Sequence, residues 1–316
     1  MQKLPLPIAG VALAFLTWGN ILKEISSVMY IFCGIIASLI LILIIIKLFT
    51  SAKLVRLELT NPIIVSSSAT FPMVLIVFST YLLFLNENFA KFIWFIGLVL
   101  HFILLIFIIN NFVRRYTWEG FCATYFIPFV GFVVASVTAP VFAMLTLGKI
   151  LFYLGFVFFA ILLLPVIYRI FVIKKMSIFL QPTNMIIAAP ANLCLAGYLS
   201  SFLNPSVEVV GVLLSLSLVS TFSGYYFFIR MNHQIFFPTF SAATFPFAIS
   251  ALATKKAAEF FIIQGYSFSK IITVIANIQI ILAIFYVFTY SSVTVFFFLL
   301  RKKNKMKPLF NRVFIR

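Results

Sequence analysis

The prolines of this chain follow a pattern that strongly limits its fold. Ten of the 13 prolines lie as pairs in five long apolar stretches, which alternate with stretches that hold almost none. Proline removes a backbone donor and kinks a helix, and inside a bilayer the carbonyl that it frees must face protein or water. We therefore predict an inner set of kinked helices and an outer, lipid-facing set. The paired prolines are Pro5, Pro7, Pro62, Pro72, Pro128, Pro140, Pro182, Pro190, Pro238 and Pro246.

The apolar stretches occupy nearly the whole chain. The sequence is 64% hydrophobic and 9% charged, with a mean hydropathy of +1.20, which excludes an ordinary soluble domain. A bilayer core about 30 Å thick needs roughly 20 apolar residues per helix. We predict an all-α polytopic membrane protein with a single pore domain at 1–300 and a basic cytoplasmic tail at 301–316. The ten predicted spans are 5–22, 27–49, 61–85, 89–112, 120–142, 147–172, 181–203, 207–230, 235–258 and 269–300.

The kink-bearing prolines recur at a period of roughly 60 residues, which fits one helical hairpin per repeat. Five such hairpins predict a quasi-five-fold ring, with the odd spans inside and the even spans outside. Small and hydroxylic residues gather in the proline-bearing spans, where they either leave a lumen or allow tight packing without one. These clusters lie at 66–70, 135–139, 188–192 and 241–244.

The net charge of +17 is concentrated at the N-terminus, in the loops after even spans and in the tail. This distribution predicts cytoplasmic termini and a multi-pass protein of the plasma or inner membrane, with attraction to anionic lipid. The same surplus would also concentrate anions at a pore mouth. The basic residues are scattered over short loops, so a nucleic-acid partner is not predicted.

Several residue types that support other chemistries are missing. The chain has no aspartate, and its six acidic residues lie in loops or at span ends. No nucleophile–base set or group of metal ligands can be assembled, so we predict no enzyme, no metal and no cofactor. His101 is interpreted as a packing histidine. Cys33, Cys122 and Cys194 are predicted to be free, buried thiols.

The ninth span holds the most informative side chains. Phe245 precedes Pro246 on a helix otherwise rich in small residues, where its ring is a candidate for a hydrophobic gate. Packing is the competing interpretation, because the chain has 42 phenylalanines. Lys255 and Lys256 are candidates for attracting anions. The pore-lining candidates are Gly10, Thr70, Pro72, Pro128, Ser136, Pro190, Asn192, Ser241, Pro246 and Ile249.

Five motifs, in order, resemble the tellurite-resistance/dicarboxylate transporter (TDT) family, which includes bacterial TehA, plant guard-cell slow anion channels and fungal malate transporters. They lie at 4–10, 61–73, 125–131, 189–194 and 244–254. The resemblance implies a homotrimer in which each subunit has its own pore of five hairpins, plugged by a phenylalanine of the ninth helix. Phe245 matches that position and Phe247 is its near neighbour. In plant relatives an asparagine stands where this chain has Phe132.

Two functions compete on this basis. The first is a gated channel that passes inorganic or small organic anions through an uncharged lumen. The alternative is a carrier or exporter of C4-dicarboxylates such as malate, which would need fixed cationic groups that the span centres lack. A purely structural or signalling role is disfavoured by the proline kinks.

Overall fold

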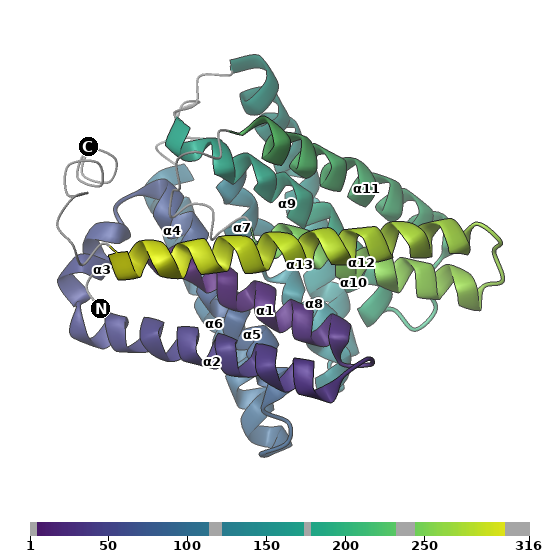
Figure 1. Ribbon diagram of the computed structural model, residues 1–316, viewed down its shortest axis with the longest axis horizontal. Helices are drawn as coiled ribbons and strands as arrows, with labels where there is room; N and C mark the ends of the chain where they lie inside the picture. Colours follow the sequence, from purple (N-terminus) through teal and green to yellow (C-terminus); the bar gives the residue numbers. More distant parts are fainter. Residues whose placement is uncertain (1–4, 114–121, 174–177, 232–243, 301–316) are drawn as a thin grey trace.

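The computed structural model describes residues 5–113, 122–173, 178–231 and 244–300, and all regular structure in these ranges is helical (Figure 1). The α-helices are α1 (Ala9–Leu22), α2 (Ser27–Thr50), α3 (Ala52–Glu58), α4 (Pro62–Ser68), α5 (Thr70–Tyr81), α6 (Glu87–Ile108), α7 (Phe126–Val130), α8 (Val133–Thr138), α9 (Leu145–Tyr168), α10 (Ala188–Ser201), α11 (Val207–Arg230), α12 (Thr244–Ile263) and α13 (Ser269–Leu300). Shorter 3₁₀ segments are η1 (Leu6–Ile8), η3 (Ala123–Tyr125), η4 (Ala139–Phe142) and η6 (Ile178–Ile187), and π-helical turns η2 (Ile109–Val113) and η5 (Arg169–Ile173) follow α6 and α9.

The predicted all-α class of fold is confirmed. Fewer helices than the ten predicted spans, however, are long and apolar enough to be recognised as membrane-crossing. Within the described ranges, six helical stretches are long and apolar enough to cross a membrane, and the pair at 123–142, bent by 46°, makes a seventh. The predicted spans 5–22 and 181–203 correspond to shorter segments that begin as 3₁₀ helix. Proline is the physical reason, because it removes the donor that a continuous α-helix requires. The ninth predicted span corresponds to α12, which carries three charged residues, Lys255, Lys256 and Glu259.

The proline-bearing segments and the others differ in burial. In the most apolar window of 62–81, 72% of the residues are buried, against 28–39% in α2, α6, α9, α11 and α13. Almost all of α1 and α10 is buried as well. The proline-bearing segments therefore form the interior, and the long apolar helices expose one side.

Helix contacts follow the order of the chain. Each inner segment packs on the outer helix that follows it, in the pairs α1–α2, α5–α6, α8–α9, α10–α11 and α12–α13. Figure 1 shows two of these pairs, with α1 beside α2 in purple and α12 beside α13 in green and yellow. The inner segments also contact one another, in the pairs α1–α5, α5–α8, α8–α10, α10–α12 and α12–α1.

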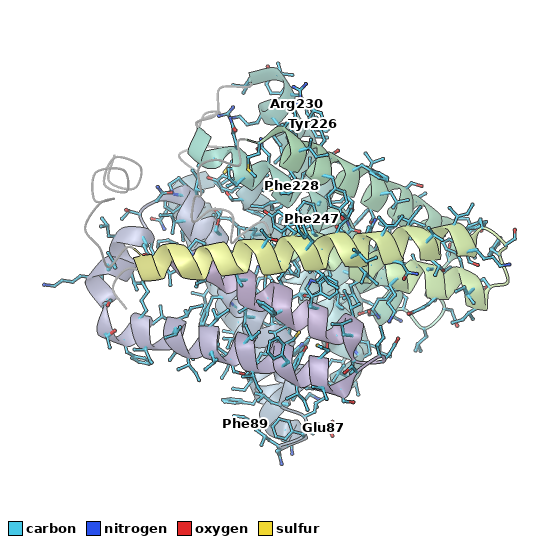
Figure 2. All side chains as sticks on the ribbon, in the orientation of Figure 1. Glu87, Phe89, Tyr226, Phe228, Arg230 and Phe247 are labelled. Atoms are coloured by element: carbon cyan, nitrogen blue, oxygen red, sulfur yellow. The ribbon has the colours of Figure 1, made fainter. Side chains whose placement is uncertain are left out.

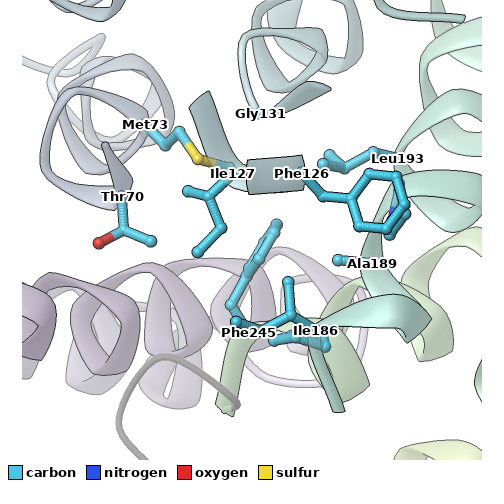
Figure 3. A pocket seen from close by; sticks show the side chains of 11 residues that line it. Thr70, Met73, Phe126, Ile127, Gly131, Ile186, Ala189, Leu193 and Phe245 are labelled. Atoms are coloured by element: carbon cyan, nitrogen blue, oxygen red, sulfur yellow. The ribbon is translucent and has the colours of Figure 1, made fainter. Parts of the chain in front are cut away.

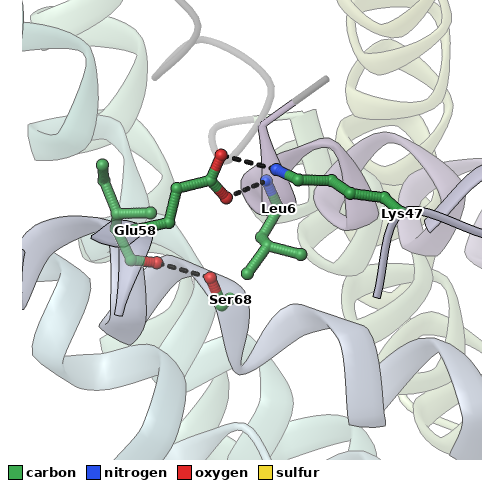
Figure 4. A network of polar contacts seen from close by, with 5 residues as sticks. Leu6, Lys47, Glu58 and Ser68 are labelled. Carbon is green, nitrogen blue, oxygen red and sulfur yellow. Dashed lines mark hydrogen bonds and ion pairs between the residues drawn. The ribbon is translucent and has the colours of Figure 1, made fainter. Parts of the chain in front are cut away.

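A buried ion pair fastens the start of the first inner segment (Figure 4). Glu58, at the end of α3, accepts hydrogen bonds from Lys47 Nζ at 2.5 Å and from the backbone N–H of Leu6 at 3.2 Å. Lys47 is only 1% exposed, so losing the Glu58 carboxylate would remove an ionic partner from a buried charge. The short helix α3, which the sequence analysis treated as a loop, brings Glu58 to this position.

Glycines on three outer helices let them approach the inner segments closely. A Cβ atom added to Gly97 of α6 would lie 2.8 Å from Ile76 Cγ1, and one on Gly155 of α9 would lie 2.0 Å from Val133 Cγ2. On α11, a Cβ at Gly224 would lie 2.9 Å from the Cβ of the α10 residue Ala188. Small residues at these contacts permit the backbone proximity that stabilises helix pairs in lipid.

We predict that Gly97→Ala destabilises the protein by about 1–3 kcal/mol, the usual cost of overpacking. Its new methyl group would meet Ile76 and also the carbonyl oxygen of Pro72 at 3.0 Å. Gly211→Ala is the matched control, since its Cβ would meet nothing within 4 Å, and alanine is a better helix former by about 1 kcal/mol. Thermal unfolding of the detergent-solubilised variants measures both effects. Equal melting temperatures for the two variants would contradict the prediction.

Candidate functional site

A narrow cavity lies between the inner segments (Figure 3). Its free volume is about 20 Å³, which is room for about one water molecule. Side chains from α5, α7, η6, α10 and α12 surround it, and no ionisable group is among them. The lining residues are Thr70, Met73, Phe126, Ile127, Gly131, Ile186, Ala189, Pro190, Leu193, Phe245 and Pro246.

Phe245 occupies the middle of this arrangement. Figure 3 shows its side chain rising from α12 into the space beside Ile127, with Phe126 and Ala189 nearby. The residue is 4% exposed. The aromatic ring is therefore one of the buried side chains that border the cavity.

The structure brings together only part of the predicted pore lining. Phe245 and three lining candidates border the cavity: Thr70, Pro190 and Pro246. The other described candidates are buried, but they do not border this cavity: Gly10, Pro72, Pro128, Ser136, Asn192 and Ile249. Ser241 lies outside the described residues, as does the predicted tail at 301–316.

The bulky cavity residues were not among the predicted pore-lining residues, because small and hydroxylic side chains were the expected lining. Phe126 and Ile127 directly precede Pro128, Met73 directly follows Pro72, and Ile186 lies four residues before Pro190. All four residues lie within four positions of a proline in an inner segment. Position relative to proline was thus the signal that could have identified them.

A histidine on an outer helix supports the bend next to the cavity. The helix breaks between α7 and α8, where Gly131 donates to the carbonyl of Ile127 at 2.9 Å and Val134 donates to that of Gly131 at 3.0 Å. The carbonyl of Pro128 instead accepts a hydrogen bond from His101 Nε2 at 2.9 Å. His101 is fully buried on α6, and this bond confirms that it has a structural role.

Asn192 connects three helices rather than lining the cavity. Its Nδ2 lies 2.7 Å from the carbonyl oxygen of Ala188, 2.8 Å from Thr221 Oγ1 on α11 and 3.0 Å from Ser250 Oγ on α12. Ser250 in turn donates to the carbonyl of Pro246 at 2.7 Å. The amide therefore helps to position the first turns of α12, which carry Phe245.

Phe247 lies on the opposite side of α12 from Phe245. Its ring stacks on Tyr225 of α11, with ring centroids 4.8 Å apart, and meets Tyr286 of α13 edge-on at the same separation. Phe228 adds a third aromatic contact, at a centroid distance of 6.5 Å, and Figure 2 shows the two phenylalanines together. Phe247 is thus a packing residue between α12 and the outer helices.

Phe132 also faces the outer helices. Its ring lies 5.1 Å from that of Phe102, 5.8 Å from that of His101 and 6.2 Å from that of Phe158. The residue is fully buried. Its contribution is therefore to packing around the bend.

The two lysines on α12 differ in their partners. Lys255 Nζ lies 2.6 Å from a carboxylate oxygen of Glu24, just beyond α1, and 3.6 Å from one of Glu259. The hydrogen bond and the charge of Lys255 hold the pKa of Glu24 below its ordinary value, so the pair persists at neutral pH. No carboxylate of the described residues lies within 4 Å of Lys256.

Nothing in the described part of the chain resembles a metal centre. No three His, Cys, Asp or Glu side chains there converge as metal ligands. Cys33, Cys122 and Cys194 are free and buried, as predicted.

The fold is that of a multi-pass helical membrane protein, and its inner segments surround a small cavity lined by no ionisable side chain. The family model for voltage-dependent anion channels (SLAC1) matches residues 4–295. The chain belongs to this family, which confirms the resemblance noted from its motifs, and the members of the family are channels and transporters rather than enzymes. No curated protein matches the chain significantly.

We predict that His101→Leu lowers the free energy of unfolding by about 1–3 kcal/mol, because it leaves the buried Pro128 carbonyl without a donor. His101→Gln, which keeps an N–H donor on a side chain of similar reach, should recover part of that loss. Thermal unfolding in detergent compares the two variants. A His101→Leu protein as stable as the wild type would show that the Pro128 carbonyl does not need this donor.

Proposed function

We propose that this protein is a gated anion channel whose passage runs between its inner segments and is closed by Phe245. The observation that carries the proposal is the position of the Phe245 ring in a cavity with room for about one water molecule. A constriction of this kind blocks ions by occlusion and by excluding water. Rotation of one side chain would then open the path without rearranging the helices.

The proposed architecture is a quasi-five-fold ring of ten membrane-crossing segments. The sequence of inner contacts, from α1 through α5, α8, α10 and α12 back to α1, supports this arrangement. The excess of lysine and arginine in alternate loops supports cytoplasmic termini in a plasma or inner membrane. Three copies would form the assembly, each with its own passage.

In this proposal the lumen itself is uncharged, and anion selectivity comes from the positive electrostatic field of the basic residues around it. Backbone carbonyls at the kinks would repel anions, but two of them are directed to outer helices. The Pro128 carbonyl is bonded to His101, and the Pro72 carbonyl lies against Gly97. An anion in the lumen would thus meet few acceptor oxygens, while the net charge of +17 raises its local concentration.

We predict that Phe245→Ala raises the chloride conductance of the purified protein in planar bilayers by about tenfold or more, equivalent to removing about 1.4 kcal/mol of barrier. Phe247→Ala is the matched control, since it deletes an equal ring from the same helix on the side that faces Tyr225. It should lower stability and leave conductance unchanged.

Two outcomes would overturn this proposal. An unchanged conductance of Phe245→Ala would remove Phe245 from gating, and an equal increase in Phe247→Ala would show that loosened packing opens the protein. Flux that saturates with malate and depends on a proton gradient would instead identify a dicarboxylate carrier. A channel would instead give a current that rises linearly with the applied voltage.

A further inference from the structure

The connections between each inner segment and the outer helix that follows it are short and apolar. We call them the hairpin tips, and they comprise residues 23–26, 82–86, 143–144, 202–206 and 264–268. Among them, only the first holds charged residues, Lys23 and Glu24. Connections that project into water are normally polar, so the composition of the hairpin tips indicates another environment.

The hairpin tips lie at the same end of the molecule. Inner segments that pack side by side are joined near their tips by an ion pair or by contacts of aromatic rings. These contacts are Lys255–Glu24 at 2.6 Å, Tyr30–Tyr81 with ring centroids 4.1 Å apart, Trp94–Phe142 with ring centroids 5.7 Å apart, and Lys149 Nζ at 5.5 Å from the ring centroid of Phe202. The hairpin tips therefore form one continuous surface.

Large apolar side chains on this surface have little protein around them. Ile25, Phe84 and Leu203 are 78%, 82% and 75% exposed, and Ile263, the last residue of α12, is 82% exposed. Exposed apolar side chains that gather in this way mark a contact with a membrane or with another protein.

The outer helices indicate how deep the hairpin tips lie in the bilayer. Exposed apolar side chains occur within the first three residues of α2, α6, α11 and α13, at Val28, Phe89, Val209 and Ile271, and at the sixth residue of α9, Ile150. Three helical residues rise about 4.5 Å, whereas the headgroup layer is about 5–8 Å thick on each side of the hydrocarbon core. The lipid-facing surface thus begins so close to the tips that they remain inside the headgroup layer.

Two lysines near the hairpin tips have surroundings typical of a lipid interface. Lys23 Nζ lies 5.3 Å from the ring centroid of Tyr30, and Lys149 Nζ lies over the ring of Phe202. Aromatic rings are enriched at the level of the headgroups, and a lysine there covers apolar surface with its stem while its ammonium group reaches water.

We propose that the hairpin tips are an interaction surface for membrane phospholipid and lie in the headgroup and glycerol layer of one leaflet. Lipid fits better than a protein partner because the apolar surface of the tips continues without a break into that of the outer helices. The connection 51–61, outside the hairpin tips, differs in carrying the exposed charges of Lys53 and Arg56. This inference does not depend on the proposed channel function.

The test places one fluorescent label at a time on the purified protein in phospholipid nanodiscs. Phe84→Cys and Leu203→Cys carry the label on two separate hairpin tips. Leu39→Cys is the control for the hydrocarbon core, since it lies in the middle of α2 and is 58% exposed, and Lys53→Cys is the control for water. The native cysteines are free but buried, so the unsubstituted chain serves as the labelling blank. Thermal unfolding checks that each variant is folded, and either tip position alone is sufficient.

The quenchers are iodide in the water and nitroxide lipids, with the nitroxide on the headgroup or deep in the acyl chain. The headgroup nitroxide should lower the emission of the tip labels by about twofold or more, because label and nitroxide share a layer about 5–8 Å thick. The label at position 39 should respond mainly to the acyl-chain nitroxide, and the label at position 53 mainly to iodide.

Two results would overturn the lipid surface. Tip labels that iodide quenches as strongly as the label at position 53, with no response to nitroxide lipids, would show that the tips project into water. Protection from all the quenchers would show that a second copy of this chain, the sole protein component besides the nanodisc scaffold, covers the tips. Both results would leave the channel proposal unchanged.

Discussion

The structure depends on how it accommodates, inside a membrane, helices whose backbone hydrogen bonding is interrupted by proline. Proline interrupts the inner segments, and a carbonyl without a donor is costly where no water reaches it. The outer helix α6 meets this need at the break between α7 and α8, where His101 Nε2 donates to the Pro128 carbonyl. Gly97 lets the same helix pack closely against the backbone of α5 at Pro72. The kinks that create an interior are therefore stable only because straight outer helices fit closely around them.

Different sides of helix α12 make different kinds of contact. Phe247 faces the aromatic residues of α11 and α13, Ser250 faces Asn192 and Lys255 faces Glu24. These contacts hold the rotation of the helix, so that Phe245 is placed in the cavity. Two phenylalanines two residues apart thus have opposite surroundings, and of the two adjacent lysines only Lys255 lies within 4 Å of a carboxylate of the described residues.

Much of this arrangement could be predicted from the chain. Paired prolines in alternate spans correctly indicated which segments are buried, because the kink requirement is local and the apolar stretches are long. Of the predicted pore residues, Thr70, Pro190, Phe245 and Pro246 border one cavity. Ser136 and Asn192 do not border it, since a small or polar side chain suits a contact between helices as well as a lumen. Ser136 bonds Ser201 at 3.0 Å, and Asn192 binds α11 and α12.

By itself the sequence determined that this protein is helical, that it lies in a membrane and that it belongs to an anion-channel family. Composition and proline spacing carry that information, because they act through hydrogen bonding and burial along each segment. Only the tertiary structure decided which ring fills the cavity, which carbonyl His101 binds and which lysine is paired. These choices depend on the rotation of helices about their axes and on neighbours such as Glu24 and Lys255, which lie 231 residues apart in the chain.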